Sequence, residues 1–207
     1  RRFVDTYEDI RPYLELVDKD QPVPLSYFEV LTAMGFAAFA EAPVDVAVVE
    51  VGMGGTWDST NVADGRVAVV TPVGLDHTKY LGDTIGEIAG EKAGIIKPES
   101  IAVLAAQEPD AAQVLLRRAA EVDATVAREG SEFGVVSRAV AVGGQVLTLQ
   151  GLAGVYDELF VPLHGAHHAQ NTAVALAAVE AFLGAGADTG VIDVEVGEYP
   201  DVQRAFV

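Results

Sequence analysis

Short runs of β-branched apolar residues alternate in this chain with segments of helical spacing, and this alternation most narrows the folds open to it. The runs VDVAVVEV (44–51) and RVAVVTPVGLDH (66–77) are typical of strands buried on both faces. Further strands are predicted at 101–106 and 124–128. The helical segments are 7–18 (interrupted by Pro12), 25–43, 84–96, 109–123 and 166–186. The pattern predicts an α/β fold, a mostly parallel sheet covered by helices on both faces.

The pattern changes between about 131 and 163. Two β runs flank Gly143 and Gly144, which is a hairpin signal, and the run ELFVPL adds a third. We expect a small antiparallel β patch there, within the same domain or at its edge. The stretch GADTGVIDVEVGEYPD is the expected loop, and YPDVQRAFV resembles the start of a helix.

Composition excludes several classes of function. The 207 residues include no cysteine, which rules out disulfides, thiolate metal sites and thiol nucleophiles. The 13 basic and 31 acidic residues give a net charge of −18, which disfavours nucleic acid and anionic membranes as partners. The ordinary explanation of the charge, a solubility bias spread over solvated faces, is the preferred one. No run is long enough to span a membrane and none resembles a signal peptide, so we expect a cytoplasmic protein.

Polar residues follow two of the predicted buried strands. Glu50 ends the first strand and is followed by Gly52, Gly54 and Gly55, and the pair Asp76-His77 follows the second. Ligands bind at the carboxyl ends of strands in open α/β sheets. One carboxylate and one imidazole suit Mg²⁺ or Mn²⁺ better than zinc, and the glycines allow backbone amides to approach a phosphate or metal. The alternative is a simple turn with a solvated Glu50.

Three further features have both a functional and an ordinary reading. Lys92 in GEKAGIIKP is a site residue or a surface lysine. The stretch HGAHHAQN begins a helix that carries Asn171 in its first turn. This stretch is either a nucleotide contact or a capping turn with solvated imidazoles. Phe28 lies on an apolar helix, where core packing is the ordinary role.

Taken in order, SYFEVLTAMGFAAFA, DVAVVEVGMGGTWDSTNV, VTPVGLDHTKYLGDTIGEIAGEKAGIIKP and LHGAHHAQNTAVALAAVEAFL resemble the bifunctional folylpolyglutamate synthase/dihydrofolate synthase family of the Mur ligase superfamily. The likeness covers residues 7 to 185. It implies an ATP-dependent amide ligase that adds L-glutamate to dihydropteroate or tetrahydrofolate through an acyl phosphate. It implies no nucleic-acid or membrane partner, and we expect a monomer.

The resemblance also implies roles for single residues. Glu50 and His77 match Mg²⁺ ligands, and Lys92 matches a lysine that is carbamylated and helps to hold a second Mg²⁺. His77 and Lys92 are therefore the expected catalytic residues. Phe28 and Asp58 match positions that line the pterin pocket. The resemblance implies that Phe28 stacks on the pterin and that Asp58 forms a hydrogen bond with it. Asn171 and His167 match the nucleotide-binding motif.

The chain departs from the family pattern in several places. Thr56 and Trp57 stand where the family has arginine and leucine, and His168 stands where it has glutamine. No G-x-x-x-x-G-K-[ST] motif occurs, so residues 1–207 are expected to be the central part of the ATP-binding domain, truncated at both ends and inactive alone. The alternatives are another Mur-type ligase, acting on a peptidoglycan precursor, and a non-catalytic binding module. GGTWDSTN with EKAGII argues against the former.

Overall fold

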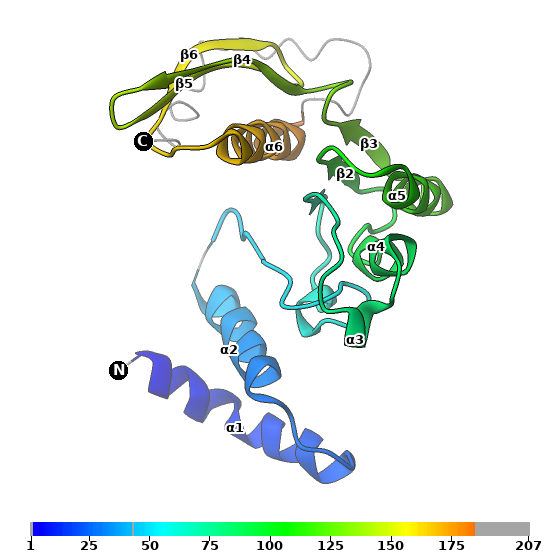
Figure 1. Ribbon diagram of the computed structural model, residues 1–207. Helices are drawn as coiled ribbons and strands as arrows, with labels where there is room; N and C mark the ends of the chain where they lie inside the picture. The colour runs from blue at the N-terminus through cyan, green and yellow to red at the C-terminus, as the bar shows by residue number, and fades with distance from the viewer. Residues whose placement is uncertain (1, 43, 185–207) are drawn as a thin grey trace. The chain divides into compact units, whose positions relative to one another are not determined.

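A computed structural model describes residues 2–42 and 44–184, and these residues divide into two compact units, residues 1–63 and residues 64–207 (Figure 1). The first unit is helical with a long glycine-containing loop. The second holds two small sheets. The expected loop within 186–201 and the expected helix start at 199–207 lie outside the described residues.

The first unit begins with two helices, α1 (Arg2–Asp20) and α2 (Tyr27–Glu41), which contact each other. The expected interruption at Pro12 was wrong, because α1 continues through it. No residue of α1 is buried, so the carbonyl that loses its hydrogen bond to proline can be hydrated instead. The start of α2 has a capping box, in which the Glu29 amide donates to Ser26 Oγ (3.3 Å) and the Ser26 amide to Glu29 Oε2 (2.7 Å).

The prediction of a buried strand at 44–51 was wrong. Residues 44–51 form no strand, and Val48 is 93% exposed. A β-branched run becomes a strand only when a neighbouring backbone pairs with it, and none of the described strands pairs with this run. Residues 44–51 therefore have the composition of a strand but no partner strand among the described residues.

The second unit contains a parallel sheet in the order β1-β2-β3. Its strands are β1 (Val67–Val70), β2 (Ile101–Leu104) and β3 (Thr125–Arg128). Two helices, α4 (Ile85–Ala93) and α5 (Pro109–Glu121), lie in the connections and contact each other. The predicted strand at 66–77 is shorter than expected, since a loop follows Val70 and leads to the short helix α3 (Thr78–Leu81).

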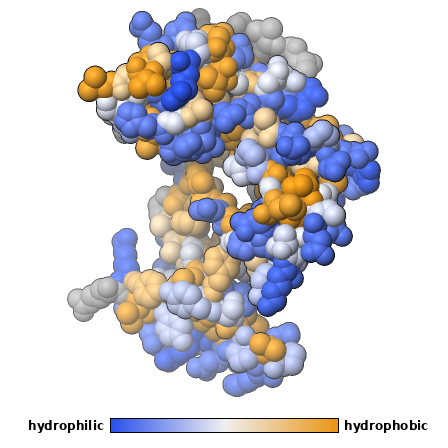
Figure 2. Space-filling view, viewed as in Figure 1, coloured by the Kyte–Doolittle hydropathy of each residue, from blue (hydrophilic) through white to orange (hydrophobic). Residues whose placement is uncertain are grey.

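The expected antiparallel patch is confirmed as a separate three-stranded sheet. Its strands are β4 (Gly134–Ala141), β5 (Gly144–Gln150) and β6 (Val155–Val161), with Gly143 in the predicted hairpin turn at φ 79°. Apolar residues also lie on the surface of this unit (Figure 2), among them Val136, Val140 and Val155.

The last described helix, α6 (Ala166–Leu183), joins the two sheets through one core. Its buried Ala173, Leu176 and Ala177 share a cluster with Val103 of the parallel sheet and Leu147 of the antiparallel sheet. In Figure 1, α6 lies beneath the antiparallel sheet. The predicted fold class, an α/β protein with a parallel sheet flanked by helices and an antiparallel patch, is confirmed.

Candidate functional site

The glycine loop of the first unit lies against the aromatic ring of Phe28. A Cβ atom built on Gly52 would lie 2.6 Å from Cε1 of Phe28 and 3.0 Å from Oδ2 of Asp58, so no side chain fits at residue 52 without movement. Phe28 comes from α2 and is 43% exposed, so one part of its ring covers the loop and another part stays accessible. The two expected pterin residues, Phe28 and Asp58, therefore both border Gly52.

Asp58 organises this loop from within. It is 7% exposed and caps the short 3₁₀ helix η1 (Ser59–Val62). Its Oδ1 accepts hydrogen bonds from the Thr60 amide (2.9 Å) and the Thr60 hydroxyl (2.6 Å), and its Oδ2 accepts one from the Met53 amide (2.8 Å). Burial raises the pKa of Asp58, but these hydrogen bonds outweigh it and hold the pKa below its ordinary value. A carboxylate offers about four acceptor positions, so Asp58 has little capacity left for a ligand.

The remaining loop residues differ in exposure. Gly54 and Gly55 are buried, and Gly54 has φ 75°, a conformation that favours glycine. Trp57, one of the departures from the family pattern, is 51% exposed. Glu50 is exposed, and its carboxylate has no hydrogen-bond or ion-pair partner within the part of the chain that the structure describes.

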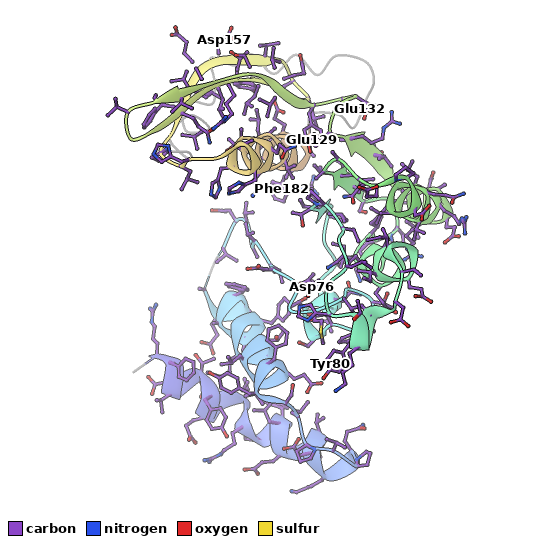
Figure 3. All side chains as sticks on the ribbon, in the orientation of Figure 1. Asp76, Tyr80, Glu129, Glu132, Asp157 and Phe182 are labelled. Carbon is purple, nitrogen blue, oxygen red and sulfur yellow. The ribbon has the colours of Figure 1, made fainter. Side chains whose placement is uncertain are left out.

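In the second unit, Asp76 and His77 lie in the loop that follows β1 (Figure 3, where Asp76 is labelled). His77 adopts the left-handed conformation, with φ 50°, at the N-terminus of α3. Its amide donates to Asp76 Oδ1 (2.7 Å), and its Nε2 lies 3.7 Å from Asp76 Oδ2. The imidazole is about half exposed and is free to meet a ligand.

Lys92 lies in the last turn of α4 and is half-buried. Its ammonium group has no hydrogen bond or ion pair with any residue in 2–42 or 44–184. Neither of these interactions joins Lys92 to His77, although α3 and α4 are in contact. A half-buried lysine can bury its aliphatic stem and keep its ammonium group accessible to a ligand.

The donor chemistry of these residues fits a hard divalent cation. Glu50 and His77 offer a carboxylate and an imidazole that no strong protein contact occupies, which suits Mg²⁺. Among the described residues, no three His, Cys, Asp or Glu side chains form a metal-binding group. Glu50 belongs to the first unit, and His77 and Lys92 belong to the second. Their convergence on a shared site stays a prediction.

The expected nucleotide-binding residues lie at the start of α6. Gly165 precedes the helix with φ 111°, and a Cβ there would lie 2.6 Å from Cε1 of His167. His167 and Asn171 are both exposed, and the rings of His167 and His168 are 4.1 Å apart. The His167 imidazole therefore lies close to Gly165, whose backbone conformation only glycine adopts easily.

Two glutamines that contact these loops were missed at the sequence level. Gln145 on β5 is fully buried, and its Nε2 donates to the Gly165 carbonyl (3.3 Å). Gln107 follows β2, and its side chain makes hydrogen bonds to Val70 at the end of β1 and to Thr71 and Val73 in the loop after it. The available signal for Gln107 was its position, a polar residue just past a buried strand at the carboxyl edge of the sheet.

A hollow of about 590 Å³ lies at the same edge, lined by Val73, Gly74, Ile85, Glu108, Pro109 and Asp110. It is bordered by the loop after β1 and by the start of α5. Its two acidic side chains make it unsuited to an anion.

None of the described helices is long and apolar enough to cross a membrane.

Comparison with known proteins places these motifs in a family. A family model described as the Mur ligase middle domain matches residues 26–179. The dihydrofolate synthase/folylpolyglutamate synthase of Mycobacterium tuberculosis is 55% identical over 199 residues, which cover 90% of this chain and 41% of the relative. The expected resemblance is thereby confirmed.

Solved structures agree with this result. The folylpolyglutamate synthase of Mycobacterium tuberculosis complexed with ADP superimposes with a TM-score of 0.85 at 57% identity, over 90% of this chain and 43% of that one. An FPGS–AMPPCP–folate complex superimposes with a TM-score of 0.82 at 37% identity, over 86% of this chain and 44% of that one. This chain spans less than half the length of these relatives. It belongs to the Mur ligase middle-domain family.

Proposed function

We propose that this chain is the central part of an ATP-dependent ligase that joins L-glutamate to dihydropteroate or tetrahydrofolate. The observation that carries the proposal is the match to a folylpolyglutamate synthase at 57% identity and a TM-score of 0.85 over 90% of the chain. The relatives' complexes with ADP, and with AMPPCP and folate, support ATP and a folate as substrates.

The reaction consists of two transfers. A carboxylate oxygen of the pterin-linked substrate attacks the γ-phosphorus of ATP, and ADP leaves with the electron pair of the broken bond. The amino nitrogen of glutamate then attacks the acyl carbon, and phosphate leaves as the amide forms and the nitrogen loses a proton. Positioning and charge stabilisation supply most of the catalysis in such phosphoryl transfers.

The glycine loop supplies the pterin side. The accessible part of the Phe28 ring offers a face on which a flat heterocycle can stack. Asp58 holds the loop in the shape that presents the Phe28 ring, and it would meet a ring N–H of the pterin only by sharing an oxygen that already accepts from the loop. Trp57, exposed beside Asp58, offers a second aromatic surface in the same loop.

The metal and nucleotide residues act on the phosphates. Glu50 and His77 would hold one Mg²⁺, and Lys92 would hold a second after its neutral amine has added CO₂ and lost a proton to give a carbamate. Bound Mg²⁺ would neutralise negative charge on the transferring phosphoryl group. His167 and Asn171 would contact the nucleotide from the exposed start of α6. We expect this ligase to act in the cytoplasm as a monomer.

A direct assay tests the proposal. The complete polypeptide that contains this chain, with ATP, Mg²⁺ and L-glutamate, should release phosphate only when dihydropteroate or tetrahydrofolate is added. Supplying the two pterins separately shows which one is used. Phosphate release with a peptidoglycan precursor alone, or none with any acceptor, would contradict the proposal in favour of another Mur-type ligase or a binding module.

Lys92→Ala tests the carbamate role in the same polypeptide. Synthesis should fall by at least about 10³-fold with the unfolding midpoint unchanged, and added short carboxylic acids should restore part of it. Lys19→Ala, on the exposed helix α1, is the matched control and should keep normal activity. Near-normal activity of Lys92→Ala would show that Lys92 is an ordinary surface lysine.

A further inference from the structure

We infer that Gln107 is a positioning residue for His77, which it serves by clamping the backbone of the loop that carries the histidine. The inference rests on the proposed function, because it takes His77 as a metal ligand. Among the described residues, the hydrogen bonds of the Gln107 side chain go to Val70, Thr71 and Val73 and not to His77.

One side chain makes three hydrogen bonds, one to the last residue of β1 and two to this loop. The Oε1 of Gln107 accepts from the Val73 amide (3.0 Å), and its Nε2 donates to the carbonyls of Val70 (3.3 Å) and Thr71 (3.0 Å). These partners lie 34 to 37 residues away in sequence, so the bonds tie two distant segments together. The amide uses its acceptor and both of its donors in one place.

The clamp acts beyond the sheet rather than within it. The last ladder bond of this edge, from the Ala105 amide to the Val70 carbonyl (3.0 Å), forms without Gln107. Thr71 and Val73 lie past the end of β1, where no strand partner holds them. Removing the Gln107 amide should therefore loosen the loop and leave the parallel sheet intact.

The loop needs this anchor because, among the described residues, it is held at its two ends and not between them. At the far end, the His77 carbonyl accepts from the amides of Tyr80 (2.8 Å) and Leu81 (3.1 Å), and the Leu81 side chain is buried. At the near end, Val73 is buried and its amide is bonded to Gln107. Residues 74–76 between them are exposed.

His77 depends on both anchors. A non-glycine residue at φ 50° is held there by its surroundings, because the left-handed region is disfavoured for residues with a Cβ. Losing the near anchor lets the backbone before His77 relax, and the imidazole then samples several positions. Removing a residue that orients a metal ligand without touching the metal itself lowers the metal affinity by about 10–100-fold.

The test compares Gln107→Ala with Gln113→Ala in the complete ligase. Gln113 is exposed on α5 and has no hydrogen bond with any residue the structure describes, so it is the matched control. Mn²⁺ binding, followed by electron paramagnetic resonance without substrates, should weaken about 10–100-fold in Gln107→Ala and stay unchanged in Gln113→Ala. The Mg²⁺ concentration for half-maximal activity should rise in parallel, with the KM for the pterin unchanged.

Gln107→Glu provides a second variant in case Gln107→Ala does not fold. The carboxylate can still accept from the Val73 amide, but it cannot donate to Val70 or Thr71. Hydrogen exchange at the Val73 amide should be at least about 10-fold faster in Gln107→Ala and remain slow in Gln107→Glu. Mn²⁺ binding should weaken in both variants, because both lose the bond to Thr71.

The outcomes separate the two proposals. Unchanged Mn²⁺ affinity in both Gln107 variants overturns the positioning role, whatever the activity of the wild type. An equal loss of Mn²⁺ affinity in Gln113→Ala overturns it as well. A wild-type protein that binds Mn²⁺ in a Gln107-dependent way but ligates no glutamate contradicts the proposed function and supports the positioning role.

Discussion

Asp58 and Glu180 are two buried carboxylates, one in each unit, and each holds a loop by accepting hydrogen bonds from backbone amides. Asp58 accepts from Met53 and Thr60, at most five residues away in sequence. Glu180, 5% exposed on α6, accepts from the amides of Leu152 (2.6 Å) and Ala153 (3.2 Å) and from the hydroxyl of Tyr156 (2.8 Å), more than twenty residues away.

The difference lies in what each carboxylate connects. Asp58 folds one loop onto itself, beside exposed residues that a ligand can reach. Glu180 ties a core helix to the turn between two strands. Burial raises the pKa of Tyr156, and the hydrogen bond to Glu180 raises it further. A buried carboxylate with amide partners is therefore no sign of a substrate site by itself. The accessible surroundings of Asp58 support its proposed role more than its hydrogen bonds do.

The largest expected effect is that of Glu180→Ala. It leaves two amides and a tyrosine hydroxyl without their partner in the core, so the free energy of unfolding should fall by about 3 kcal/mol. Urea denaturation of the chain measures this. Asp157→Ala, at an exposed position on β6 (Figure 3), is the control and should change it by less than about 0.5 kcal/mol. A loss below about 1 kcal/mol would show that Glu180 does not hold the turn to α6.

Asp58→Ala should have a smaller and more local effect. The loop loses a helix cap and two amide partners, for a cost of about 2 kcal/mol that is confined to the first unit. Hydrogen exchange at the Met53 and Thr60 amides should accelerate, while amides of the parallel sheet keep their protection. Accelerated exchange in both units would break the distinction between the two carboxylates.

The pKa of Asp58 predicts how the loop responds to acid. Because the folded pKa lies below the ordinary 3.8, the ionised carboxylate stabilises the loop above about pH 4. This contribution is lost as the pH falls through the folded pKa. Protection of the Thr60 amide should therefore decline below about pH 4 in the wild type and show no such step in Asp58→Asn. A step that persists in Asp58→Asn would assign it to another group.

Two glycines sharpen the comparison further. A Cβ on Gly151 would lie 2.7 Å from Oε1 of Glu180, whereas a Cβ on Gly52 would meet mainly the half-exposed ring of Phe28. The ring can swing into solvent and the buried carboxylate cannot. Gly151→Ala should cost about 2 kcal/mol and Gly52→Ala about 1 kcal/mol, measured by urea denaturation. The reverse order would show that the glycine loop is the more rigid of the two.

The smallest effect has the opposite sign. Gly35 lies inside α2, and a Cβ there would have nothing within 4 Å. Gly35→Ala should therefore raise the free energy of unfolding by about 0.5–1 kcal/mol, because alanine restricts the unfolded chain. A decrease would show that residue 35 is covered by another part of the chain.

Local chemistry made much of the fold predictable. The hairpin at Gly143 and the capping box at the start of α2 both depend on neighbours in sequence, and the predicted hairpin was confirmed. The strand predicted at 124–128 also formed, as β3, because it pairs with β2. The strand at 44–51 depended on a partner strand, which no sequence pattern specifies, and that prediction was wrong. Pro12 was misjudged because its effect depends on the burial of the helix around it.

The candidate site was predictable only through resemblance and position. The motif around Asp58 matched a family, and the structure adds that the side chain is largely occupied by its own loop. Gln107 was not found, because its partners lie in another segment and a single glutamine has no distinctive spacing. Glu180 could have been suspected as the one charged residue in the apolar stretch AVALAAVEAFL.

The two sheets also predict an order of events in time. The antiparallel sheet pairs Ala141 with Gly144 across a tight turn, and such hairpins form in about 1–10 μs. The parallel sheet pairs Val67 with Ile101 only after an intervening helix has brought them together, so its ladders close more slowly. Pulse-labelling during refolding should therefore protect the amides of β4 and β5 before those of β1 and β2. The hairpin would then be the early surface against which α6 collapses, and the edge that carries His77 would be among the last parts of this unit to mature.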